Sequence, residues 1–145
     1  MGKSLGLLEQ IKAKLSQPKT RQQAGRVLSK WLGQQKEKQA LDYLQKNGVI
    51  SIAQNFRCDQ YQKGEIDLIG LDTSKQILIF FEVKYRKNSL YGHPTETLSA
   101  AQQQRIRRCA QVFLQKQPQY QNHDCRFDVI SFIGDKPPEW IKNAF

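Results

Sequence analysis

The stretches Gly64-Glu65-Ile66-Asp67-Leu68-Ile69 and Phe81-Glu82-Val83-Lys84-Tyr85-Arg86 decide the fold of this chain. Both are rich in the β-branched and aromatic residues that favour strands. Between them, Asp72-Thr73-Ser74-Lys75 has the composition of a turn. We therefore predict an antiparallel hairpin with one strand over 65–71 and the other over 76–86.

This hairpin would bring acidic side chains close together. With the turn centred near residue 74, Asp67 is expected opposite Phe81, one position from Glu82. Because side chains alternate along a strand, Glu82 and Lys84 share one face. Glu65 would share a face with Asp67 on its own strand. Charges in such apolar strands are costly unless they are paired or bound to a metal ion, so a structural ion pair and a functional site both remain open.

Two adjacent carboxylates favour a hard divalent cation such as Mg²⁺ or Mn²⁺ between them. Asp67 and Glu82 are therefore the candidate metal ligands. A cation held there could activate a water and neutralise charge on a phosphodiester. Lys84 is a candidate to stabilise the transition state, and Glu37, on a predicted helix, is a candidate for the surroundings of the metal.

Helices and strands are predicted to alternate along the rest of the chain. Apolar residues at helical spacing indicate a short helix over 4–16 and a longer one over 20–47. The other predicted elements are a strand over 49–57, a helix over about 97–117 and a strand over 126–133. The order of one long helix, three strands, a helix and a strand predicts an α/β fold with a mixed central sheet flanked by helices.

The charge balance points to a polyanionic partner. Lys and Arg total 23 against 13 Asp and Glu, which gives a net charge of +10 in a chain of 145 residues. The isoelectric point of about 9.7 exceeds the value of about 9 that is typical of nucleic-acid-binding domains. Positive charge in excess attracts phosphate backbones, so nucleic acid is the expected partner.

Composition also argues against several classes of protein. The longest apolar run, Ile77–Phe81, is far shorter than the roughly 20 residues of a membrane span, and the N-terminus lacks the apolar stretch of a secretory signal. Cys58, Cys109 and Cys125 are odd in number and far apart, so we expect neither a disulfide framework nor a zinc site. A cytoplasmic, reducing compartment and no membrane partner are the resulting expectations.

The segments Gly64–Ile69 and Phe81–Arg86 resemble the PD-(D/E)XK nuclease motif. Over roughly residues 33–145 the wider pattern resembles the YraN family of bacterial proteins. This pattern includes Gly33, Glu37, Ala40, Asn55-Phe56-Arg57, Gly92, Pro94, Ala110 and Arg126-Phe127-Asp128-Val129. The resemblance implies a restriction-endonuclease-like αβββαβ core, similar to archaeal Holliday-junction resolvases. The helix expected over 4–16 lies outside the resemblance and precedes this core. Residues 1–18 would then form a basic helix or arm, and 19–145 a single endonuclease-like domain.

The same resemblance implies roles for individual residues. It implies that Asp67 and Glu82 hold the metal, that Lys84 is the catalytic lysine and that Glu37 is the helix acid near the site. Gln102 stands where relatives often carry Lys, so a positive charge is missing there. The candidate nucleic-acid contacts are Arg57, Arg86, Lys87, Gln102 and Arg105.

Three functions follow as hypotheses. The first is a metal-dependent endonuclease, using Mg²⁺ or Mn²⁺ on DNA rather than RNA, with branched or otherwise structured DNA as a possible substrate and a homodimer as the expected assembly. The second is a nucleic-acid-binding module that keeps the nuclease fold without turnover. The third is a protein-interaction factor whose basic N-terminal arm docks an acidic partner. Arg126 and Asp128 are expected to be structural, and Tyr85 either packs or stacks on a base.

Overall fold

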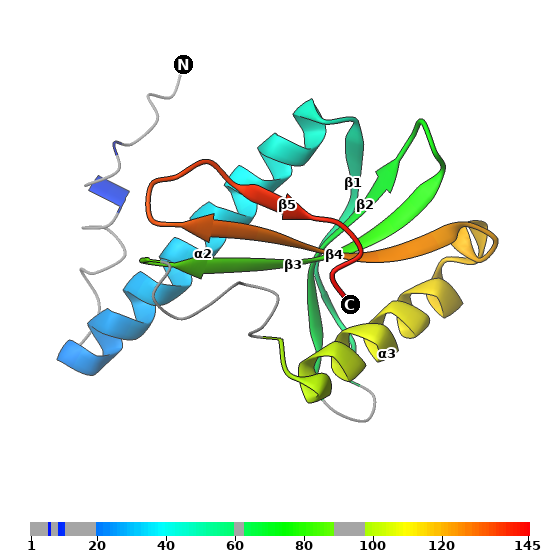
Figure 1. Ribbon diagram of the computed structural model, residues 1–145. Coiled ribbons are helices and arrows are strands. Elements are labelled where there is room, and N and C mark those ends of the chain that lie inside the picture. Colours follow the sequence, from blue (N-terminus) through cyan, green and yellow to red (C-terminus); the bar gives the residue numbers. More distant parts are fainter. Residues whose placement is uncertain (1–5, 7–8, 11–19, 60–62, 89–97) are drawn as a thin grey trace, which may run out of the picture.

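A computed structural model of the chain describes residues 6, 9–10, 20–59, 63–88 and 98–145. The helix predicted over 4–16 lies almost wholly outside these residues. The described elements follow the predicted order (Figure 1), and their bounds are α2 Arg21–Lys46, β1 Val49–Arg57, β2 Glu65–Asp72, β3 Ile77–Arg86, α3 Ala100–Lys116, a 3₁₀ turn Pro118–Tyr120, β4 Asp124–Ile133 and β5 Glu139–Ile141.

The strands form one sheet in the order β1-β2-β3-β4-β5. Strands β1, β2 and β3 are antiparallel neighbours, β3 and β4 are parallel, and β5 pairs antiparallel with β4. The α/β fold with a mixed central sheet is therefore confirmed, and it is consistent with a restriction-endonuclease-like core. Strand β5 was not predicted, because three residues directly after Pro137-Pro138 give too short a pattern to recognise.

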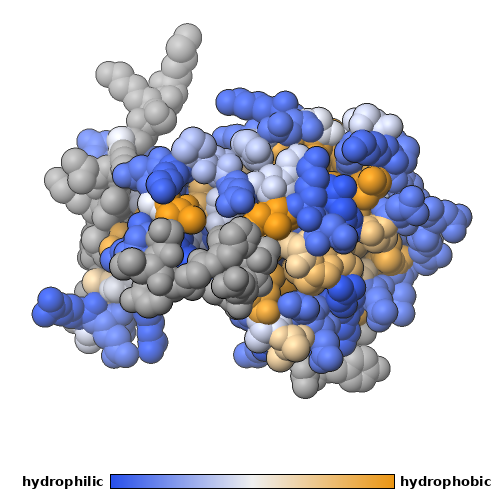
Figure 2. Space-filling view, viewed as in Figure 1, coloured by the Kyte–Doolittle hydropathy of each residue, from blue (hydrophilic) through white to orange (hydrophobic). Residues whose placement is uncertain are grey.

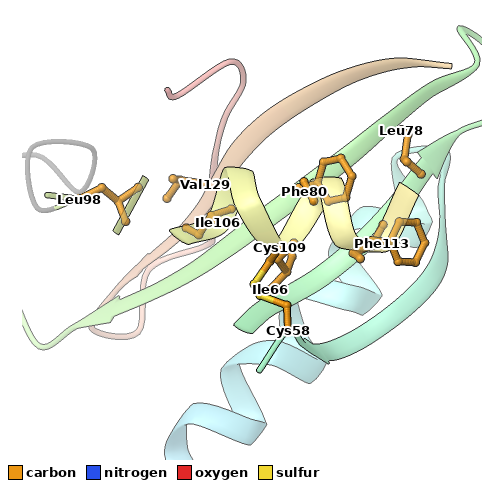
Figure 3. Packing of buried hydrophobic residues seen from close by; sticks show 11 residues of the cluster. Cys58, Ile66, Leu78, Phe80, Leu98, Ile106, Cys109, Phe113 and Val129 are labelled. Carbon is orange, nitrogen blue, oxygen red and sulfur yellow. A yellow bond between two sulfur atoms is a disulfide. The ribbon is translucent and has the colours of Figure 1, made fainter. Parts of the chain in front are cut away.

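The two long helices cover opposite faces of the sheet. On one face, Phe113 of α3 packs with Ile66 and Phe80 in one buried cluster (Figure 3). On the other face, Leu44 of α2 packs in a second cluster with Phe81. Because β3 is covered on both sides, its sequence is a continuous apolar run rather than an alternating one.

Side chains define where each helix begins. Thr20 Oγ1 accepts a hydrogen bond from the Gln23 N–H at 3.1 Å at the start of α2. At the start of α3, Ser99 and Gln102 form a capping box, in which Gln102 N–H donates to Ser99 Oγ and Ser99 N–H donates to Gln102 Oε1. Gly48, with φ of 84°, ends α2 in the left-handed conformation that glycine adopts most easily.

Asp128 fixes the C-terminal segment to the sheet. Its carboxylate is fully buried and accepts bonds from the Arg126 guanidinium, from Trp140 Nε1 at 2.8 Å and from the Asn143 N–H at 2.8 Å. The bond with Arg126 also raises the pKa of that guanidinium. The expectation that Arg126 and Asp128 are structural, with Asp128 paired in the core, is confirmed.

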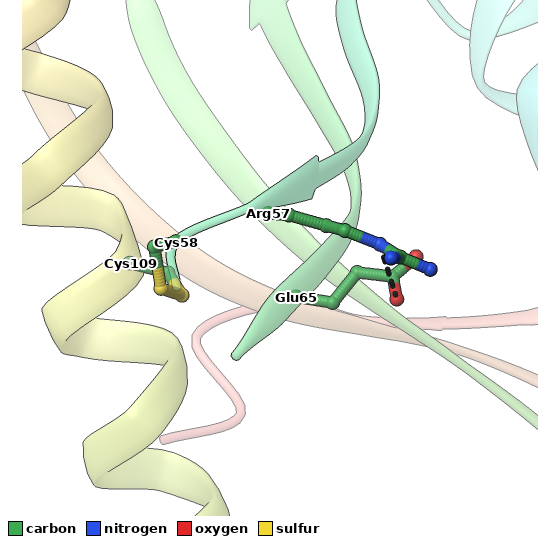
Figure 4. The surroundings of a disulfide bond; sticks show 4 residues. All are labelled: Arg57, Cys58, Glu65 and Cys109. Atoms are coloured by element: carbon green, nitrogen blue, oxygen red, sulfur yellow. Dashed lines mark ion pairs between the residues drawn. A yellow bond between two sulfur atoms is a disulfide. The ribbon is translucent and has the colours of Figure 1, made fainter. Parts of the chain in front are cut away.

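A disulfide joins Cys58, just after β1, to Cys109 on α3 (Figure 4). The prediction of no disulfide is wrong, because the fold brings Cα atoms 51 residues apart in sequence to within 5.3 Å. Cys125 is free and exposed, as expected for an odd number of cysteines. Gly64 lies against the disulfide, since a Cβ there would be 2.7 Å from Cys109 Sγ.

Hydrophilic side chains cover most of the face shown in Figure 2, and smaller apolar patches lie between them. Among the described residues, the exposed large apolar side chains are Leu28, Ile50 and Tyr85. Among the described parts of the chain, no helix combines the length and the apolar character needed to cross a membrane.

Candidate active site

The candidate site lies where β2 and β3 separate. The two strands pair from Asp72 and Ile77 as far as Leu68 and Phe81. Beyond that pair, β2 continues beside β1 and β3 continues beside β4, so the two strands diverge, as Figure 1 shows. Asp67 and Glu82 are the first residues past the last pair, at the point of this fork.

The register differs by one residue from the predicted one. We expected Asp67 opposite Phe81, and the structure instead places Leu68 there. The shift arises because the hairpin is centred half a residue beyond residue 74, the centre assumed in the prediction. Its effect is to bring Asp67 into line with Glu82, so the two carboxylates are closer in register than predicted.

Hydrogen bonds and an ion pair hold the central acids in place. The Val83 N–H donates to Asp67 Oδ2 at 2.8 Å, and Lys84 Nζ lies 3.3 Å from Glu82 Oε1. The side chains of Glu82 and Lys84 are only 17% and 25% exposed. The sheet therefore brings two acids and one amine together in a largely dehydrated place.

This crowding of carboxylates changes their proton affinity. Burial, reinforced by the charge of Glu82, raises the pKa of Asp67 to about 8, although the Val83 N–H opposes the shift. Burial also raises the pKa of Glu82, against the opposing effects of Lys84 and of a hydrogen bond with Asp67. Without a cation the pair consequently retains a proton near neutral pH, and a divalent cation would replace that proton.

Two further acids lie beside the pair and are joined by Asn55. With its amide nitrogen turned toward them, Asn55 Nδ2 lies 3.0 Å from Glu37 Oε2 and 2.9 Å from Glu65 Oε1. Burial raises the pKa of Glu37, the bond with Asn55 lowers it, and the charges of Glu65 and Glu82 raise it again. Glu37 of α2 and Glu65 of β2 therefore belong to the same electrostatic cluster.

Asn55 is the site residue whose role the sequence reasoning missed. It adopts a φ of 50° in the middle of β1, a left-handed conformation that asparagine tolerates better than most residues. Strained backbone of this kind is concentrated at functional sites. The available signal was an asparagine inside a predicted strand, where that residue is normally disfavoured.

A cavity of about 450 Å³ opens beside the acids on the side of α3. Its walls include Glu65 and Glu82 and three of the predicted nucleic-acid contacts, Arg57, Gln102 and Arg105. Arg57 also lies 4.0 Å from the carboxylate of Glu65 (Figure 4). The amide oxygen of Gln102 is already used in the capping box of α3, which leaves its amide nitrogen for a phosphate.

A second cavity, of about 520 Å³, lies on the side of α2. Asp67, Glu82 and Glu37 line it together with Lys87, the fourth of the predicted contacts. Arg86, the fifth, is the last residue of β3 and is not among the residues that line either cavity. Four of the five predicted contacts therefore line a cavity beside the acids, and their contact with nucleic acid stays a prediction.

Asp67 and Glu82 could supply two carboxylate ligands to a divalent cation. Within the described residues, no group of three or more His, Cys, Asp or Glu side chains is arranged to hold one ion. Mg²⁺ usually takes one or two carboxylates and completes its shell with water and substrate phosphate. Asp67 and Glu82, which both line the cavity on the α2 side, fit that ligand set.

Comparison with known proteins places the chain among relatives of similar length. Residues 36–132 match the Uncharacterised protein family UPF0102. The chain belongs to the UPF0102 family. It is 41% identical over 117 residues to a UPF0102 protein of Pseudomonas putida, covering 78% of this chain and 91% of that protein.

Two other members of the UPF0102 family show the same degree of similarity. The chain is 42% identical over 114 residues to a UPF0102 protein of Francisella tularensis, covering 79% of this chain and 93% of that one. It is 42% identical over 117 residues to a UPF0102 protein of Coxiella burnetii, covering 81% of this chain and 93% of that protein. The expected resemblance to this family, also called YraN, is confirmed.

Proposed function

We propose that the chain is a metal-dependent endonuclease that hydrolyses phosphodiester bonds, with DNA as its substrate and Mg²⁺ or Mn²⁺ as its cofactor. The observation that carries the proposal is the half-buried pair Asp67 and Glu82 at the fork of the sheet. These two acids lie beside Lys84 and between two cavities that carry basic side chains. A divalent cation would replace the proton that the pair holds, and it would attract a phosphate to the site.

Each residue has a distinct task in this proposal. Asp67 and Glu82 bind the cation, and the Val83 N–H holds the Asp67 carboxylate in position. A cation held by these two residues would supply acid activation of water and charge neutralisation at the phosphate. Lys84 donates hydrogen bonds to the developing negative charge on the phosphate. Glu37 is a positioning residue. It lines the cavity on the α2 side, and Asn55 links its carboxylate to that of Glu65.

A cleavage panel tests the proposal. Linear, flap and branched DNA, with matching RNA strands, would be incubated with the protein in Mg²⁺, in Mn²⁺ and in EDTA. We expect cleavage of DNA with either metal, none in EDTA, and a loss of about 100-fold or more in the Glu82→Gln variant. Asp124→Asn, which removes an exposed carboxylate from the far end of β4, is the matched control and should cleave normally.

Two outcomes would contradict the proposal. If no substrate is cleaved in either metal, the protein is not a nuclease. If the protein cleaves nothing but binds DNA in a salt-sensitive manner, and Glu82→Gln binds equally well, a nucleic-acid-binding module without turnover is supported instead. Cleavage that is equal in the wild type and in Glu82→Gln would show that the acid pair is not the catalytic centre.

A further inference from the structure

The two cavities meet at Glu82 from opposite faces of the sheet. Glu82 lines both. On β3, Phe80 belongs to the cluster under α3 and Phe81 to the cluster under α2. By alternation Glu82 faces α3 and Tyr85 faces α2. The strands β2 and β3 separate at this point, and Glu82 is the carboxylate that the two cavities share.

The cavity on the α2 side has the chemistry of a nucleotide site. Lys36 Nζ lies 4.9 Å from the ring centroid of Tyr85 and 5.1 Å from that of Phe132. It also donates to the neutral amide oxygen of Gln39 at 3.4 Å. Its positive charge is therefore held at the cavity wall by aromatic rings and an amide. Tyr85 itself keeps 38% of its surface exposed, and Lys87 lies on the same wall.

We propose that a single DNA strand crosses the acid pair from the α3 cavity to the α2 cavity, with an unpaired base stacked on Tyr85 and the adjoining phosphate held by Lys36. This proposal rests on the proposed function and specifies its substrate. The opposite end of the strand would be held by Arg57 and Arg105, which line the α3 cavity. None of the motifs that indicate the acid pair points to Lys36.

The chemistry of the cavity wall favours an unpaired strand over intact duplex. A base inside a duplex is stacked on its neighbours and presents no free face to a tyrosine, whereas unpaired bases stack on aromatic side chains without regard to sequence. Each cavity also falls within the range of about 300–1,000 Å³ that encloses small ligands, a class that includes a single nucleotide. The expected substrate is therefore DNA with a single-stranded segment, such as a flap or a frayed branch point.

The test measures binding separately from cleavage. Fluorescence anisotropy would follow a labelled single-stranded oligonucleotide, the same strand with one abasic residue, and a duplex of equal length. Ca²⁺ would replace Mg²⁺, because it takes the same oxygen ligands at longer distances and polarises them less. The variants are Tyr85→Ala, Tyr85→Phe and Lys36→Ala, with Lys75→Ala in the exposed turn after β2 as the matched control.

We expect Tyr85→Ala to weaken binding of the intact single strand about 10-fold, while Tyr85→Phe, which keeps the ring, binds as the wild type does. Removing the base at the stacking position should weaken wild-type binding and leave Tyr85→Ala unaffected. Lys36→Ala should lower the slope of log affinity against log salt concentration by about 0.7, the value for one phosphate contact on a single strand. Lys75→Ala should change neither quantity.

Several results would overturn the proposed course of the DNA strand across the acid pair. It fails if Tyr85→Ala binds the single strand normally, or if that variant weakens intact and abasic strands equally, which would show a structural effect rather than stacking. It also fails if duplex binds more tightly than single strand. If these results accompany normal metal-dependent cleavage, only the proposed course of the DNA strand is wrong, and the proposed function stands. If neither form of DNA is bound or cleaved, the proposed function fails as well.

Discussion

Replacing Cys58 and Cys109 together with alanine is expected to lower the free energy of unfolding by about 4 kcal/mol. A cross-link across 51 residues removes much of the conformational freedom of the unfolded chain, and the effect grows with the length of the closed loop. Urea denaturation of the wild type and the double variant would measure the difference. The bond also fastens the residues after β1 to α3, and both segments line the 450 Å³ cavity.

Dithiothreitol and a matched cysteine variant provide the controls for this experiment. The reductant should bring the wild type close to the stability of the double variant and leave the double variant itself unchanged. Cys125→Ala, which removes the exposed free thiol, should unfold as the wild type does. Equal urea midpoints for the wild type with and without reductant would show that the cross-link contributes nothing to stability.

Replacing Asp128 with alanine is expected to cost about 3–5 kcal/mol of stability. This carboxylate is fully buried and bonds to Arg126, Trp140 and the Asn143 N–H. Its removal would leave a guanidinium that is 17% exposed without its partner, and an uncompensated charge in such a place is strongly destabilising. The C-terminal segment, with β5, would lose its attachment to the sheet. Thermal and urea unfolding would measure the loss.

Two further substitutions make this result interpretable. Asp128→Asn keeps an acceptor oxygen for Trp140 or Asn143 and should be less destabilising, so it remains measurable if the alanine variant does not fold. Asp124→Ala, on the same strand but exposed, should change stability by no more than about 0.5 kcal/mol. A change below about 1 kcal/mol in Asp128→Ala would contradict the anchoring role.

The main elements of the fold could be predicted from the sequence because their signals are local. The apolar run Ile77–Phe81 identified the central strand, and the helix beginning at Ala100 carried apolar residues at helical spacing. Alternation along β3 placed Glu82 beside Lys84, and the structure shows their ion pair. The elements predicted least well were those with few residues, such as β5.

What could not be predicted depends on contacts between distant segments. Nothing near Cys58 or Cys109 in sequence indicates that the end of β1 meets the middle of α3. The bridge from Asn55 to Glu37 and Glu65 requires a left-handed residue inside a strand. The one-residue change in hairpin register depended on turn geometry, which composition alone does not specify.

Calorimetric titration of Mg²⁺ or Mn²⁺ into the protein tests the central claim, a cation site made by Asp67 and Glu82. Since the pKa of Asp67 is raised to about 8, the cation must displace a proton below that pH. Affinity should therefore rise by up to about tenfold per pH unit between about pH 6 and pH 8, with proton release into the buffer. Asp67→Asn should lose the site and Asp124→Asn should keep it. Wild-type protein that takes up neither metal, or Asp67→Asn that binds as tightly as wild type, would contradict the account.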